Sequence, residues 1–437
     1  MTDNRPSGEK PDLPWASSSG DAEEGRPETA AGDAVVKSKL PQAESKRSIL
    51  LGALFLMATS AIGPGFITQT ATFTVKMGAA FAFAIFLSIL VDIAVQLNVW
   101  RVIGVSGLRA SELGNRILPG VGILLGVFVV FGGFVFNVGN VAGGGLGINA
   151  MTGLDTTWGG IITAVLAVLV FLSKKAGVAL DKIVVVLGVL MILITGYVAV
   201  VSGPPIGDAL RQTVFPDNVD LAVITTLIGG TVGGYITYAG AHRMIDAGVS
   251  GVDDVKSISN ASITSIVVTG VMRYLLFLAI LGVVAGGVTL TSSNLAAEAF
   301  QHAAGEIGLR LFGVILWAAS ISSVIGAAYT SVSFMTTRNT KTWIRNVLTV
   351  GMIVLSTIVF FSLGKAPGTL LVIAGTINGL ILPLGFTVIL IVAIFRRDLL
   401  SGYRYPKWLI VVGVLVWLLT LYLGASAVGQ LSTLWNG

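Results

Sequence analysis

The heptapeptide Ser60–Phe66, with the sequence SAIGPGF, interrupts the first long apolar segment of the chain. Pro64 lacks a backbone N–H donor, and its ring clashes with the preceding turn of a helix. Glycine on both sides lowers the cost of unwinding. A second interruption, Gly229–Tyr235 with the sequence GGTVGGY, lies in the sixth apolar segment. We therefore expect two broken helices, one in each half of the chain.

Paired Gly/Pro-interrupted segments are typical of transporters built from inverted repeats, in which the substrate site lies between the two breaks. The half-helix that starts after Gly65 would present free N–H groups and a positive dipole end, which suits an anion. Glycine-rich segments also serve close helix packing. We assign that role to Gly143–Gly145, whereas Pro64 is not needed for packing and favours a true break.

The composition indicates an all-α integral membrane protein. Of the 437 residues, 54% are hydrophobic and 11% are charged, against roughly 25% charged residues in a soluble domain. A span needs about 20 mostly apolar residues. We predict eleven spans, near residues 49–75, 79–102, 119–148, 157–173, 180–202, 221–247, 261–287, 308–333, 342–363, 369–394 and 407–428.

The distribution of basic residues predicts the orientation, because cytoplasmic loops are enriched in Lys and Arg. With a cytoplasmic N-terminus, 22 of the 27 Lys and Arg residues fall on the cytoplasmic side. Four fall outside, and Arg273 lies within a span. Eleven spans then place the C-terminus outside. The short loops that carry these charges give no indication of nucleic-acid binding.

The chain divides into two parts. Residues 1–45 are rich in Ser, Pro, Gly, Asp and Glu, a composition typical of disorder, and we expect a cytoplasmic tail. The first long apolar run starts near Ile49, too deep for a signal peptide. Residues 46–437 would form the transporter domain, with repeat one at 49–202, repeat two at 221–394 and an extra span at 407–428.

Several functional classes are excluded by residue counts. The chain has no Cys and only two His, His242 and His302, so thiolate sites and multi-histidine metal centres are excluded. No glycine run continues into a phosphate-binding loop, and no Ser/His/Asp set can be assembled. We expect no enzyme activity, no catalytic residue, no cofactor and no metal site. Transport would be passive or ion-coupled, because no ATPase domain is present.

Two charged residues lie within predicted spans. A buried arginine in a membrane is expensive and marks a functional site by default, so Arg273 is a candidate counter-ion for an anionic substrate. It is equally a candidate partner for Asp92, the one carboxylate well inside a span. Both roles stay open, and they can coexist if substrate competes with Asp92. We also assign Asp92 a role in ion coupling.

Neutral polar residues cluster around the two breaks. Amides and hydroxyls both donate and accept hydrogen bonds, which suits a small polar organic molecule better than a bare cation. The predicted substrate site comprises Gly63, Pro64, Gly65, Phe66, Gln69, Asn137, Asn140, Gly233, Gly234, Tyr235, Thr237, Arg273, Gly375 and Asn378.

Several stretches occur in the order found in one known family. They are Gly63–Phe66, Val105–Leu113 (VSGLRASEL), Ile228–Val232, Ser322–Ser323 with Tyr329, Leu382–Pro383 and Arg396–Leu399. From Gly52 to about Leu400 the chain resembles the Nramp (natural resistance-associated macrophage protein) divalent-metal transporters. The resemblance implies a LeuT-like core of ten spans plus one, and a multi-pass protein of the bacterial inner membrane.

The family's polar site residues are all replaced in this chain. Its first-span Asp and Asn and its sixth-span Met coordinate the metal, and they correspond to Gly63, Phe66 and Gly233. The adjoining Pro-His pair corresponds to Gly234 and Tyr235. The third-span Asp and Glu of its proton route correspond to Asn137 and Asn140, its ninth-span Arg to Val350 and its tenth-span Gln to Gly375.

These replacements argue against tight metal binding, because a divalent ion needs anionic or strong oxygen ligands in place of its hydration shell. We predict a secondary transporter for a small organic carboxylate or an amino-acid-like solute. The chain also resembles an Nramp-related bacterial branch in Ala94–Arg101 (AVQLNVWR), which implies a 5-oxoproline-type solute.

Two alternatives stay open. One is a proton-coupled or passive importer of Mn²⁺ or Mg²⁺ that holds a hydrated ion. The other is a sensor or scaffold on a transporter fold, although no large cytoplasmic domain supports it. The expected partners are the substrate and the lipid bilayer, and the sequence fixes no oligomeric state.

Overall fold

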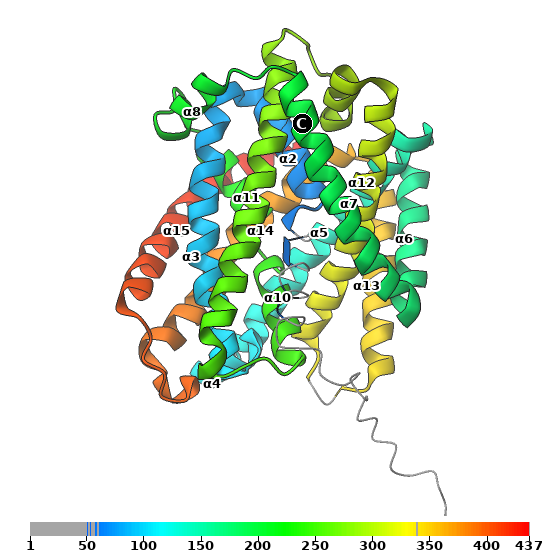
Figure 1. Cartoon of the computed structure of the whole chain (residues 1–437). Helices are drawn as coiled ribbons and strands as arrows, with labels where there is room; N and C mark the ends of the chain where they lie inside the picture. Colours follow the sequence, from blue (N-terminus) through cyan, green and yellow to red (C-terminus); the bar gives the residue numbers. More distant parts are fainter. Residues whose placement is uncertain (1–49, 51–52, 54–56, 59–60, 338–339, 437) are drawn as a thin grey trace, which may run out of the picture. The chain divides into compact units, whose positions relative to one another are not determined.

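The computed structural model describes residues 50, 53, 57–58, 61–337 and 340–436, and gives the backbone alone for 174–185 and 429–436. The predicted tail, residues 1–45, lies outside the described residues. The helices, labelled in Figure 1, are α2 (Pro64–Met77), α3 (Phe81–Ser106), α4 (Ala110–Ile117), α5 (Val121–Thr152), α6 (Thr156–Leu172), α7 (Lys174–Val201), α8 (Ile206–Val214), α9 (Leu221–Gly229), α10 (Ile236–Asp246), α11 (Val255–Ala285), α12 (Leu295–Met335), α13 (Thr342–Leu363), α14 (Pro367–Phe395) and α15 (Lys407–Asn436).

Three short 3₁₀ turns, Gly78–Ala80, Val252–Asp254 and Arg397–Leu400, complete the described elements. Gly305, with φ of 64°, bends α12 near its start. Every predicted span contains helix. Among the described residues, seven helical segments are long and apolar enough to cross a membrane, with α2 and α3 taken as one segment. An eighth arises if α7 and α8, which meet at 110°, form one bent span. The count of eleven spans, with its two repeats, stays a prediction.

Both breaks predicted from the sequence are confirmed. Ala61 is helical, Ile62 and Gly63 are not, and α2 starts at Pro64. In the second break, α9 ends at Gly229 and α10 starts only at Ile236. The chain between them turns tightly, because the N–H groups of Thr231, Val232 and Gly233 all point to the carbonyl of Ile228, at 3.0–3.2 Å.

Helix α5 packs along α12, α14 and α6 and forms the centre of the fold. Its glycines explain these close approaches. A Cβ atom on Gly147 would lie 2.6 Å from the Trp317 nitrogen of α12, and one on Gly144 would lie 2.4 Å from Thr163 Cγ2 of α6. The packing role predicted for Gly143–Gly145 is thus confirmed, and α5 brings its polar residues close to both breaks.

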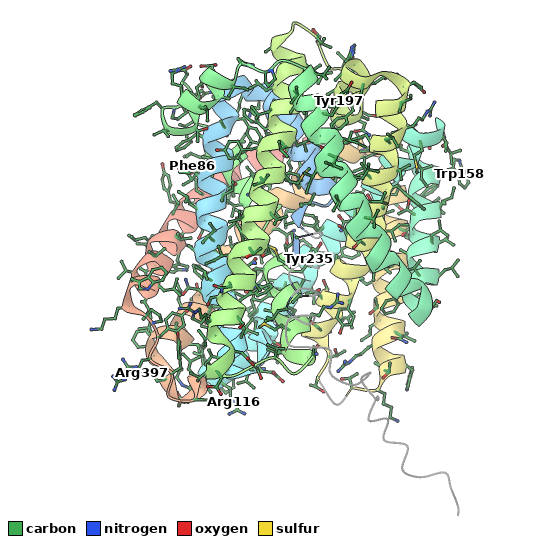
Figure 2. The ribbon with its side chains drawn as sticks, in the orientation of Figure 1. Phe86, Arg116, Trp158, Tyr197, Tyr235 and Arg397 are labelled. Carbon is green, nitrogen blue, oxygen red and sulfur yellow. The ribbon has the colours of Figure 1, made fainter. Side chains whose placement is uncertain are left out.

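The flanks of the helices expose large apolar side chains. Figure 2 shows Phe86 on α3, Trp158 on α6 and Tyr197 on α7, and the last two are about 60% exposed. Extended apolar surface of this kind is rare on soluble monomers and is expected where helices meet lipid.

Candidate functional site

The start of α2 is a helix end without a side-chain cap. Gly63, the N-cap residue, has an extended conformation (φ −67°, ψ 179°) and no side chain that could cap the helix. Pro64 occupies the first helical position. The first N–H groups of a helix have no partner within it. Gly65 and Phe66 therefore carry polarised N–H groups at the positive end of α2, as the sequence predicted.

One face of α5 lies against this helix end. Phe136 is in contact distance of Gly65, because a Cβ atom on that glycine would lie 3.0 Å from the ring. Gly143, two turns further along α5, lies against Pro64 in the same way, at 2.3 Å. Residues i, i+4 and i+7 share one face of a helix. Asn140 therefore lies between these two contacts and faces the break.

Asn137 and Asn140 are fully buried amides that make no hydrogen bond of standard geometry. Each is 0% exposed, and neither the oxygen nor the nitrogen of either amide makes such a bond to a described residue, although the Tyr235 side chain lies close to Asn140. Such atoms normally find partners, and each one left unsatisfied costs about 1–3 kcal/mol. Four in two neighbouring turns indicate a site that is completed by a ligand or by water.

Tyr235 joins the second break to these amides. It occupies the N-cap position of α10 without a capping side-chain bond, its ring meets Phe136 edge-on at 5.7 Å, and its side chain lies beside Asn140. Its hydroxyl is completely buried and makes no hydrogen bond of standard geometry to a described residue. Figure 2 shows Tyr235 midway along the helices. The Thr237 hydroxyl, two residues later, is buried and unpartnered as well.

Helix α14 closes the site from another side through Asn378. The Asn378 amide nitrogen donates to the carbonyls of Gly132 (3.0 Å) and Ala374 (2.8 Å). Its oxygen lies over Gly234, where a Cβ atom would come within 1.6 Å. Gly234 also has φ of +55°, a conformation that disfavours any residue with a Cβ. Asn378 thus fixes the second break rather than only lining it.

Gln69 ties α2 to the same region. Its amide nitrogen donates to the carbonyl of Leu371 at 3.2 Å, and its side chain packs on Gly230 and Gly375. Its oxygen is buried without a partner. The absence of a side chain at Gly375 makes room for Gln69, which explains why that position is glycine.

Arg273 and Asp92 form an ion pair away from the amides. Arg273 Nη2 lies 2.5 Å from Asp92 Oδ2, and Nη1 donates to Ser88 Oγ at 2.8 Å. Both charged side chains are 0% exposed. Asp92 also lies beside Thr231 of the second break, so the pair supports the unwound segment. Pairing, one of the two roles left open, is confirmed, and contact of Arg273 with substrate stays a prediction.

Phe66 lies apart from the polar atoms. It belongs to an apolar cluster with Ile67, Met272 and Leu371, so its backbone and not its ring faces the site.

One polar cluster was missed by the sequence analysis. Arg109 Nη2 pairs with both carboxylate oxygens of Asp246, at 2.8 and 3.1 Å, and His242 bonds to Ala110 and Ser333. The residue patterns predict no role for His242, and they mark Arg109 only as one of the basic residues that the positive-inside rule assigns to the cytoplasmic side. The available signal was the resemblance of Val105–Leu113 to a family loop.

The site is neutral in the part of the chain that the structure describes. No group of three or more His, Asp or Glu there could hold a metal ion, and the one carboxylate beside the second break, Asp92, is paired with Arg273. The remaining groups are amides, hydroxyls and the N–H groups of α2. They can hold a carboxylate or an amide by hydrogen bonds.

Comparison with known proteins agrees with this architecture. The chain is 46% identical over 392 residues to the membrane protein YcsG of Bacillus subtilis, covering 89% of this chain and 96% of that protein. It is 45% identical over 398 residues to a membrane protein of Haemophilus influenzae, covering 90% and 98%.

Solved structures share the fold. A mutant of the manganese transporter of Eremococcus coleocola superposes with a TM-score of 0.70 at 16% identity, covering 91% of this chain and 90% of that one. MhsT in complex with L-phenylalanine gives 0.61 at 18% identity, covering 86% and 98%. The fold is therefore LeuT-like. The model of the Nramp family, described as natural resistance-associated macrophage protein-like, matches residues 54–429, so the chain belongs to this family of membrane transporters, which are not enzymes.

Proposed function

We propose that this transporter carries a small organic carboxylate or an amino-acid-like solute, such as 5-oxoproline, across the bacterial inner membrane. The observation that carries the proposal is the pair of buried, unpartnered amides, Asn137 and Asn140, next to the uncapped start of α2. A carboxylate would accept hydrogen bonds from the N–H groups of Gly65 and Phe66. The amides and the Tyr235 hydroxyl would bind the solute's amide or amino group.

A neutral site supports this solute class over a divalent ion. Mg²⁺ and Ca²⁺ require hard oxygen ligands, commonly carboxylates, and the family's first-span Asp is Gly63 here. Asp92 already neutralises Arg273, so it does not provide a free charge. We assign Asp92 to ion coupling only through this pair, since protonation of the carboxylate would release Arg273 beside the second break.

The orientation belongs to the same proposal. Arg116 and Arg397 lie at the same end of the helices as α4 (Figure 2), and Arg396 donates to the carbonyl of Arg116 there. These three arginines lie at the α4 end, and the positive-inside rule assigns an end that is rich in Lys and Arg to the cytoplasm. The N-terminus would be cytoplasmic and the C-terminus outside.

A second candidate, transport of a divalent metal ion, is favoured by the family and by the manganese transporter that shares the fold. Such an ion would have to remain largely hydrated, because the site offers only neutral oxygen atoms.

Thermal stability of the purified protein separates the two candidates. Binding to the native state raises the apparent unfolding midpoint. We expect a rise with 5-oxoproline or a related small carboxylate and none with Mn²⁺, Mg²⁺ or Ca²⁺. Tyr235→Phe, which removes only the hydroxyl, should weaken the response about three- to tenfold in ligand concentration, the effect of one neutral hydrogen bond.

The matched control is Tyr238→Phe. Tyr238 is a buried tyrosine on the same helix, and its hydroxyl lies against Gly385 rather than the amides. The control should respond to the carboxylate like the unmodified protein. A midpoint that rises with a divalent ion alone would contradict the proposal and support the hydrated-ion site.

A further inference from the structure

One arginine at the α4 end of the molecule joins three helices. Arg109, at the N-cap of α4, is only 3% exposed. Its Nη2 atom donates to both oxygens of Asp246 at the end of α10. Its Nη1 atom donates to the carbonyls of Ser333 (3.1 Å) and Thr336 (3.3 Å) at the end of α12. Only the planar fork of an arginine can make these bonds in several directions at once.

His242 strengthens the same junction with a defined proton arrangement. Its Nε2 atom accepts from the Ala110 N–H at 3.3 Å, and its Nδ1 atom lies 3.0 Å from Ser333 Oγ. The Ser333 hydroxyl donates its own proton to the carbonyl of Thr330, so it accepts from His242 Nδ1–H. The neutral imidazole therefore connects α4 to α12 in parallel with Arg109. We call Arg109, Asp246, His242 and Ser333 the Arg109 clamp.

An aromatic layer lies beneath the clamp. Phe334 of α12 packs on Tyr238 and His242 of α10, with ring centroids 5.2 and 5.0 Å apart. Deeper still, a Cβ atom on Gly133 would meet both Ser331 Oγ (2.1 Å) and Tyr235 Cβ (3.7 Å). Ser331 thus lies between the clamp and the candidate substrate site. On its other side, Arg109 borders a cavity of about 900 Å³ lined by residues of α4, α5, α12 and α13.

Helix α10 connects the clamp directly to the substrate site. Tyr235 directly precedes its first residue, Asp246 is its last residue, and the helix has only 11 residues. Transporters of this architecture work by gating one group of helices against another around a fixed site. Any movement that opens a path along α10 at the α4 end must separate it from α12. That separation breaks the contacts of Arg109 to Asp246, because the same guanidinium is held by Ser333 and Thr336.

We infer that the Arg109 clamp is the gate of the α4 end, and that breaking the Arg109–Asp246 pair is the step that opens the substrate site to that side. Arg109 is thus a positioning residue that acts through α10 and need not touch the solute. The inference depends on the chain being a transporter, not on the solute proposed above.

The sequence offers a direct test, because the chain contains no cysteine. A single Ser331→Cys substitution, nearly isosteric at a buried position, would report access from the α4 end. A second reporter, Ser320→Cys, lies on the same helix near Pro64 and Gly143 and would report access from the opposite side. Each reporter is combined with Arg109→Ala or Asp246→Asn, and its alkylation by a water-soluble thiol reagent is measured in detergent.

The clamp predicts that both substitutions raise the alkylation rate of Ser331→Cys about tenfold or more, as expected when a charge-assisted contact that holds a closed state is lost. The Ser320→Cys rate should stay the same or fall. Asp246→Asn leaves the contacts of Arg109 to Ser333 and Thr336 in place, so it keeps the test valid if Arg109→Ala fails to fold. Unfolding midpoints identify the folded variants.

Arg396→Ala is the matched control. Arg396 also forms an ion pair at the α4 end, with Asp398, but the pair is exposed and does not join α10 to α12. This substitution should leave Ser331→Cys labelling unchanged. Unchanged labelling in folded Asp246→Asn would overturn the inference, and so would an equal rise at both reporters, which indicates general loosening. None of these readouts needs a solute, so failure of the clamp and failure of the proposed substrate are distinguishable.

Discussion

Asp92→Ala should lower the free energy of unfolding by about 3–5 kcal/mol, the usual effect of leaving one member of a buried ion pair without its partner. The Arg273 guanidinium would remain fully buried, with Ser88 as its remaining side-chain partner in the described structure. A charge in such surroundings is expensive in a membrane protein. The measurement is the unfolding midpoint in detergent, together with the yield of folded protein.

The double variant Asp92→Leu/Arg273→Leu gives the control. It removes both charges, and replacing a whole buried pair by apolar residues is often nearly neutral. A double variant as unstable as the sum of the single variants would show that the pair is not the cause. The folded double variant also resolves the two roles of Arg273. A retained response to carboxylates means a structural pair, whereas a lost response means that Arg273 serves as counter-ion.

Asn137→Leu/Asn140→Leu should make the protein more stable and abolish its function. Four buried polar atoms without partners are removed at nearly constant volume, and each costs about 1–3 kcal/mol. Because water in the site satisfies some of these four atoms, we expect the free energy of unfolding to rise by only roughly 2–5 kcal/mol while the midpoint response to carboxylates disappears. Greater stability with lost function is the signature of a site that evolved for binding.

Asn98→Leu is the control for this pair. Asn98 is a buried amide on α3 whose hydrogen-bonding groups have partners. Its nitrogen donates to the Ala94 carbonyl at 2.8 Å, and its oxygen accepts from the Tyr405 hydroxyl at 2.8 Å. Its replacement leaves these partners unsatisfied and should destabilise the protein. If Asn137→Leu/Asn140→Leu is destabilised to the same extent, the two amides have partners in the native state and the account of the site is wrong.

The two breaks were predictable because proline and glycine act locally. Pro64 lacks the backbone donor that a helix interior requires, and the structure begins α2 at that residue. Pro383, by contrast, lies inside α14, so the glycines that flank Pro64 are part of the signal. Asn137 and Asn140 are candidate site residues because the resemblance places them at the family's third-span Asp and Glu, and the structure adds that both amides are buried without a hydrogen bond of standard geometry. Asn140 lies beside Tyr235, and this contact between two distant segments depends on the packing of α5 against the second break, which local sequence patterns do not specify.

The Arg109 clamp was not predictable from local pattern. Arg109, Asp246 and Ser333 are separated by more than 80 residues along the chain, and only the packing of α4, α10 and α12 brings them together. Arg273 illustrates the reverse case. A buried arginine predicts an anionic partner. The sequence does not decide whether the partner of Arg273 is the solute or Asp92, because a guanidinium binds any carboxylate in the same geometry.

Uptake into proteoliposomes tests the central claim most directly. Vesicles that contain the purified protein receive radiolabelled 5-oxoproline, with other small carboxylates as competitors, and parallel vesicles carry a dye that is quenched by Mn²⁺. We predict saturable uptake of the carboxylate that is absent in Asn137→Leu/Asn140→Leu, and no protein-dependent quenching. Saturable Mn²⁺ entry without carboxylate uptake would contradict the account, and the neutral site would then be one for a hydrated ion.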